Sequence, residues 1–113
     1  MILTNKDLQR LFRKFNKQYF QGRLDPRTVI RFADIEDGDE GEASEFCTSN
    51  IHGNGGKILI NLAYKKFPNA AIITLGHEMV HISLGGDYLQ SHGDRFSAEI
   101  VRLWNFGFYE GLL

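Results

Sequence analysis

Two histidines and a glutamate form the group of residues with the clearest chemical potential in this sequence. His77, Glu78 and His81 stand in the pattern His-Glu-x-x-His, within a stretch rich in Ala, Ile, Leu and Val. Residues four apart lie on one face of a helix, so the two imidazoles are placed to bind one metal ion. Zn²⁺ suits such ligands, and it lowers the pKa of a water that it binds to about 7. Glu78, beside the pair, is the expected base for that water.

The alternative is that these three side chains are ordinary core residues. Burying a carboxylate and two imidazoles in an apolar helix without partners carries a large desolvation penalty. A metal would satisfy the imidazoles and give the carboxylate a charge partner. The sequence therefore favours a metal site.

A catalytic zinc site usually takes three protein ligands and keeps a further position for water. His92 is the preferred third ligand, since it follows His81 after an expected helix end at residues 85–86. The start of a helix there would favour neutral imidazole, the form that binds metal. The competing ligands are Asp87, which has the metzincin spacing, Asp94, and Glu99, which would suit a gluzincin arrangement.

The remaining polar candidates are interpreted as surface or packing residues. His52 lies in a Gly-rich turn, and nothing near Cys47 indicates a reactive thiolate. Tyr64, Tyr88 and Arg95 are able to hold substrate or stabilise an oxyanion, but their positions in the sequence single out none of them.

Three helices are expected to position the motif. The first covers residues 4–20, with Thr4 and Asp7 as a capping pair. The motif helix covers residues 70–84, with Asn69 as its N-cap, and a third follows Ser91, which with Asp94 has the spacing of a capping box. The apolar residues expected to face the core are Leu8, Leu11, Phe12, Phe15 and Tyr19 in the first helix and Phe96, Ile100, Leu103 and Trp104 in the third.

Strands are expected over residues 27–34, 43–51 and 57–63, with a loop over 34–42. A hairpin through the Gly-rich turn after residue 51 would join the last two strands. The predicted fold class is α+β: an N-terminal helix, a small three-stranded and mainly antiparallel sheet, the motif helix and a C-terminal helix.

The bulk properties predict one domain covering residues 1–113. No apolar run approaches the roughly 20 residues that cross a bilayer. The N-terminus lacks the pattern of a signal peptide, and the single Cys47 has no partner for an internal disulfide. These features predict a cytoplasmic protein without membrane contact, leaving nucleoid or nuclear association open.

Charge is distributed unevenly along the chain. Residues 1–32 carry eight Lys and Arg against two Asp, whereas the charged residues of 33–50 are all acidic. A basic N-terminal helix is a candidate for a weak contact with DNA. The plainer interpretation is that these blocks are solvated faces that partly neutralise each other.

Three blocks of the sequence resemble the SprT-like zinc metallopeptidase domain, the family that includes the Spartan proteases. They are residues 11–24, similar to the family's opening helix, the His-Glu-x-x-His motif at 77–81, and His-Gly-Asp-Arg-Phe at 92–96. The resemblance implies a zincin-like fold, with His77, His81 and His92 as zinc ligands and Glu78 as catalytic base. It also implies that Phe96 packs behind the ligand His92.

The sequence thus predicts a zinc-dependent metallopeptidase that hydrolyses protein or peptide substrates, with Glu78 activating a zinc-bound water. Some members of the similar family cleave proteins crosslinked to DNA, so the resemblance extends the prediction to DNA–protein crosslink repair. The alternatives are a proteolytically idle domain and a non-catalytic, zinc-stabilised binding module for nucleic acid or protein. A closed, four-ligand site would favour the binding module.

Overall fold

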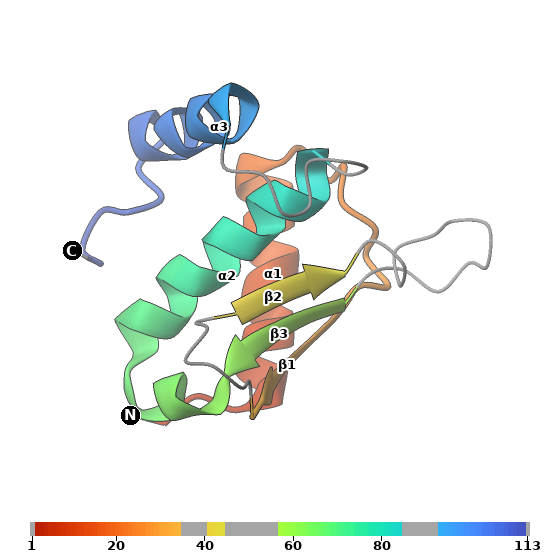
Figure 1. Cartoon of the computed structure of the whole chain (residues 1–113), viewed down its shortest axis with the longest axis vertical. Helices are drawn as coiled ribbons and strands as arrows, with labels where there is room; N and C mark the ends of the chain where they lie inside the picture. Colours follow the sequence, from red (N-terminus) through yellow and green to blue (C-terminus); the bar gives the residue numbers. More distant parts are fainter. Residues whose placement is uncertain (1, 35–40, 45–56, 85–92, 113) are drawn as a thin grey trace.

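In the sequence, one helix precedes three strands, and two further α-helices follow them (Figure 1). This order confirms the predicted α+β class. The computed structural model describes residues 2–34, 41–44, 57–84 and 93–112. In chain order these residues form α1 (Asn5–Tyr19), β1 (Val29–Ala33), β2 (Gly41–Ser44), β3 (Lys57–Asn61), the 3-10 helix η3 (Leu62–Lys66), α2 (Pro68–Leu84) and α3 (Asp94–Asn105). No helix in these ranges is long and apolar enough to cross a membrane.

The sheet has the strand order β1-β3-β2 and mixed direction. β2 pairs with β3 in antiparallel fashion, as expected for the last two strands. β1 pairs with β3 in parallel, from Val29 opposite Lys57 to Ala33 opposite Asn61. The prediction of a mainly antiparallel sheet is therefore wrong. The error arose because apolar alternation identifies a strand but does not indicate whether its neighbour runs parallel or antiparallel to it.

Strand β2 begins earlier than the sequence indicates. Gly41 and Glu42 fall in the predicted loop but belong to the strand, and the rest of the predicted strand, residues 45–51, lies outside the described residues. The segment Gly41–Ser44 has no β-branched or aromatic residue. Its conformation is therefore set by pairing with β3, because local propensity offers little support for a strand.

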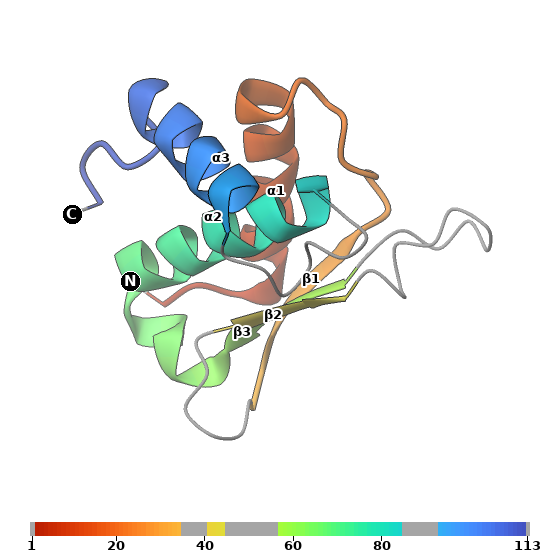
Figure 2. The same cartoon turned by 45° about the horizontal axis from the view of Figure 1, so that its top comes forward.

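One face of the sheet forms part of the core. Ile30 and Phe32 of β1 and Ile58 and Ile60 of β3 alternate with more exposed neighbours. Figure 2 shows α1 and α2 on the same side of the sheet, and both helices contact it. α3 packs on α2, so that α2 lies between the sheet and α3.

Side-chain hydrogen bonds fix both ends of helix α1. The predicted capping box is confirmed: Asp7 N–H donates to Thr4 Oγ1 at 3.2 Å, and Thr4 N–H donates to Asp7 Oδ2 at 2.8 Å. These backbone and hydroxyl hydrogen bonds from Thr4 hold the pKa of Asp7 below its usual value. Near the end of the helix, Asn16 Nδ2 donates to Leu24 O at 2.8 Å, and Leu24 N–H donates to Asn16 Oδ1 at 3.0 Å. This pair of bonds fixes the chain's path toward β1.

Helix α3 differs from the prediction at its start and on one face. It begins at Asp94 with Gly93 as N-cap and no side-chain cap, so the predicted cap by Ser91 is wrong. Phe96 and Leu103 are buried as expected, but Trp104 is 58% exposed. α3 buries a stripe against α2 that is too narrow to include Trp104, which is displaced by about 100° from Leu103 around the helix.

The end of α3 is a Schellman motif. Gly107 has φ +87°, and its N–H donates to Trp104 O at 3.1 Å while Phe108 N–H donates to Leu103 O at 3.0 Å. The motif turns Phe108 back into the core, where its ring lies edge-on to Phe15, with a centroid separation of 5.0 Å. The same ring fills the space above Gly76 of α2.

Replacing Gly76 by Ala should destabilise the protein. The added Cβ would lie 2.6 Å from Phe108 Cε1 and closer still to Cζ. Overpacking of this kind costs about 1–3 kcal/mol, against a helix-propensity gain of about 1 kcal/mol. Urea unfolding should therefore show a net loss of up to about 2 kcal/mol.

The control for this prediction is the same substitution beside a shorter residue 108. In the Phe108→Leu background the clash with the ring atoms disappears, and Gly76→Ala should become neutral or stabilising. An equal loss in both backgrounds would show that Phe108 does not limit the space at Gly76.

Candidate metal centre

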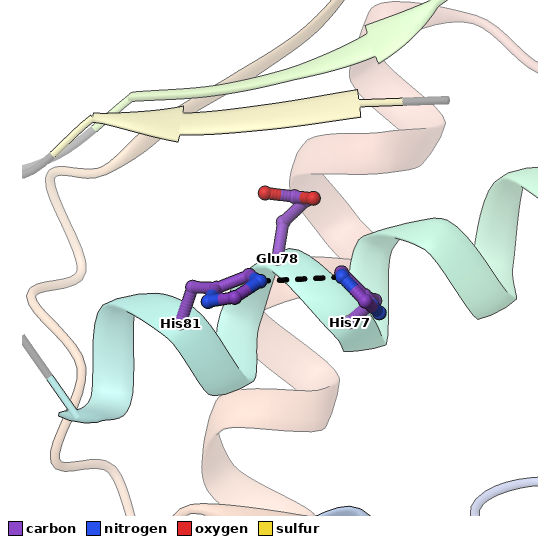
Figure 3. A group of neighbouring side chains, drawn as sticks. All are labelled: His77, Glu78 and His81. Carbon is purple, nitrogen blue, oxygen red and sulfur yellow. Dashed lines mark hydrogen bonds between the residues drawn. The ribbon is translucent and has the colours of Figure 1, made fainter. Parts of the chain in front are cut away.

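The His-Glu-x-x-His motif lies in the middle of α2, as predicted (Figure 3). Its two imidazoles point toward each other across one turn, with ring centroids 4.9 Å apart. The Nε2 atoms of His77 and His81 are separated by 3.2 Å. Without a metal, one Nε2–H donates to the other nitrogen, and the tautomers decide which ring is the donor.

The same geometry fits a tetrahedral metal ion. Two imidazole nitrogens that each lie about 2.0–2.1 Å from Zn²⁺ are roughly 3.3 Å apart. The observed separation of 3.2 Å therefore needs almost no adjustment for both rings to bind one ion. A carboxylate oxygen of Glu78 completes the group, since the three ligand atoms all lie within 4.8 Å of one another.

The site is largely buried. Glu78 is 6% exposed and His81 is 4% exposed, and their helix neighbours Leu75, Met79 and Val80 are fully buried. His77 is partly exposed, which gives the site one side open to solvent. Among the described residues, every buried side-chain nitrogen or oxygen has a hydrogen-bond partner. The three polar side chains are thus held in place within an apolar helix.

Glu78 projects from a different side of the helix than the two histidines. In Figure 3 its carboxylate points toward strand β2. α2 and β2 are in contact, so this strand lies on the side of the helix from which the carboxylate projects. The sequence analysis missed this neighbour because it assigned residues 41 and 42 to a loop. The only sequence signal for a strand near this position is the apolar pattern of β3, with which β2 pairs.

Phe96 connects α3 to the two histidines. Its ring centroid lies 4.8 Å from that of His77 and 4.6 Å from that of His81, and the side chain is buried. Aromatic contacts at these distances are favourable and restrict ring rotation. The structure thus places Phe96 against both imidazoles.

The sequence offered several candidates for a third ligand. His92, the predicted ligand, lies outside the described residues, as do His52, Cys47, Asp87 and Tyr88. Among the described residues, neither Asp94 nor Glu99 joins the group of His77, Glu78 and His81. The Glu99 carboxylate instead accepts hydrogen bonds from Arg102 Nε at 3.0 Å and Nη2 at 2.9 Å.

Two other polar candidates, Tyr64 and Arg95, lie in the described ranges. Tyr64 packs partly buried against the core, and Arg95 is exposed on the first turn of α3.

Comparison of the chain with known protein families, curated proteins and solved structures finds no match. The firm result is therefore a His-Glu-His group on a helix, consistent with an HExxH motif and able to hold a metal ion. The resemblance to the SprT-like family stays a prediction that rests on the three sequence blocks.

Proposed function

We propose that this chain is a zinc-dependent metallopeptidase that hydrolyses peptide bonds of protein substrates. The main support is the 3.2 Å separation of the His77 and His81 Nε2 atoms, with a Glu78 oxygen within 4.8 Å of the ligand atoms. His92 is proposed as the third ligand from its sequence position alone. The family resemblance supplies the peptide substrate class.

The roles of the residues follow from their chemistry. His77 and His81 would hold the ion, and Phe96 restricts the orientation of their rings. Zn²⁺, when bound, supplies a Lewis acid that polarises the scissile carbonyl and lowers the pKa of water. Glu78 takes a proton from the attacking water and then delivers it to the nitrogen of the leaving amine. Glu78 is buried, which restricts the motion of its carboxylate.

Strand β2 is the proposed docking site for the substrate backbone. It stands at the end of the strand order, and among the described residues it pairs only with β3. An extended peptide adds to such an edge through main-chain hydrogen bonds. Because β2 contacts α2 on the side toward which Glu78 points, a peptide on this edge would pass close to the carboxylate.

A weak contact with DNA is a secondary part of the proposal. The outward side of α1 carries the exposed basic residues Lys6, Arg10, Arg13, Lys14 and Lys17. Such a surface would bind phosphates without sequence preference and would release them as salt rises. Because this surface could bind DNA, we propose that the peptidase acts in the repair of DNA–protein crosslinks inside the cell.

Metal removal tests the proposed function. The purified protein should contain zinc and cleave casein or a histone. Cleavage should fall to background after dialysis against 1,10-phenanthroline and return when zinc is added, because the chelator removes the Lewis acid. Gel electrophoresis of the substrate, paired with metal analysis of the same samples, provides the measurement.

Two results would contradict the proposed function in different ways. Cleavage that persists without metal would contradict a metallopeptidase. Bound zinc with no cleavage of either substrate, with and without single-stranded DNA, would favour the zinc-stabilised binding module instead. A fourth protein ligand found by X-ray absorption would support that second result, because structural zinc sites are closed.

A further inference from the structure

A pocket of about 280 Å³ lies at the C-terminal end of α3, where the tail folds back on the helix. It is lined by Trp104, Gly107, Tyr109 and Glu110. The Schellman turn at Gly107 creates it, and the bonds from Glu110 N to Gly107 O and from Leu112 N to Tyr109 O continue the turn. The volume is slightly below that of sites for drug-sized ligands, so it suits a single side chain.

Two aromatic rings form the walls of this pocket. Trp104 and Tyr109 have centroids 5.5 Å apart and ring planes inclined by 34°. Tyr109 is itself fixed edge-on against Phe108, at 4.9 Å and 84°, and Phe108 is anchored in the core. The walls are therefore preorganised, which reduces the entropy lost when a ligand binds.

A carboxylate gives the pocket its charge. Oε2 of Glu110 lies 3.4 Å from where a Cβ on Gly107 would stand, which places it over the pocket lining. None of the ion pairs between described residues includes Glu110. The guanidinium of Arg102 is already engaged, through Glu99 and through Tyr19 O at 2.6 Å.

We propose that this pocket binds an arginine side chain presented by a protein partner. Aromatic faces attract cations, and the face of Trp does so most strongly. Arginine fits better than lysine because a planar guanidinium stacks on an aromatic face and also donates to a carboxylate in a forked arrangement. The site uses no residue of the metal centre, so the proposal stands independently of the peptidase activity.

Trp104 is the only tryptophan of the chain, so its fluorescence reports directly on the pocket. The full-length protein is titrated at low salt with acetyl-Gly-Arg-Gly-amide. A saturable change is expected, with a midpoint on the order of millimolar for an isolated side chain. The matched peptide carries citrulline, which keeps the shape of arginine and lacks its charge. It should bind at least about fivefold more weakly than the arginine peptide.

Two variants separate the pocket from general charge effects. Glu110→Gln should weaken binding of the arginine peptide by about threefold to tenfold, whereas Asp34→Asn, the same charge change at an exposed site after β1, should leave it unchanged. Equal responses to arginine and citrulline, or an unchanged midpoint in Glu110→Gln, would overturn the proposal. A lysine peptide that binds as tightly as the arginine peptide would overturn the choice of guanidinium.

Discussion

Replacing Glu78 by Gln is expected to lower the turnover of a protein substrate by about 10²- to 10⁴-fold, the usual contribution of a general base. The amide keeps the size of the carboxylate but cannot take a proton from water. Zinc content should stay unchanged, because His77 and His81 are intact and their Nε2 atoms keep the 3.2 Å spacing. Initial rates of casein cleavage, at equal zinc content measured by mass spectrometry, give the comparison.

Glu99→Gln is the matched control for this experiment. Glu99 lies on α3 and pairs with Arg102 at 2.9 Å, outside the cluster on α2. This variant should keep turnover within about twofold, since an exposed or partly exposed ion pair contributes little. If Glu99→Gln lost activity and zinc together, a gluzincin-like site would replace the proposed one. If Glu78→Gln cleaved as fast as the unmodified protein, Glu78 would not be the base.

The second large effect is expected on stability. Zinc in excess should raise the thermal unfolding midpoint, because a ligand at 100 times its dissociation constant stabilises the folded state by about 2.7 kcal/mol. For a chain of this size that corresponds to a rise of roughly 10 °C. His81→Ala removes a buried side chain that we propose as a ligand, and it should abolish the rise. Scanning calorimetry with and without zinc measures both.

Two further histidine variants sharpen this test. His92→Ala should also abolish the zinc-dependent rise if His92 is the third ligand, and a full rise in this variant would place that ligand elsewhere. His52→Ala is the matched control, since His52 is not expected to bind metal, and it should keep the rise. A rise of equal size in His81→Ala would mean that zinc binds outside the motif.

Helices were the most predictable part of the fold, because their signals are local. Thr4 and Asp7 fix the start of α1 through bonds three residues apart. The spacing of His77 and His81 brings their rings together through helix geometry alone, so the core of the candidate site could be predicted from the sequence.

Features that depend on distant contacts could not be predicted in the same way. Parallel pairing of β1 with β3 joins residues that lie 28 positions apart, from Val29 to Lys57. The exposure of Trp104 depends on how α3 lies on α2. The third ligand depends on the path of the chain between these two helices, which spacing along the sequence does not determine.

The place of β3 at the centre of the sheet also bears on how the chain folds during synthesis. β1 and β2 do not pair with each other, since the described strand order is β1-β3-β2. Neither strand obtains its partner until residues 57–61 have left the ribosome, by which point more than half of the chain has been made. Until then the apolar stripe of α1 has no completed sheet to cover, and a nascent chain in this state is a natural client for chaperones.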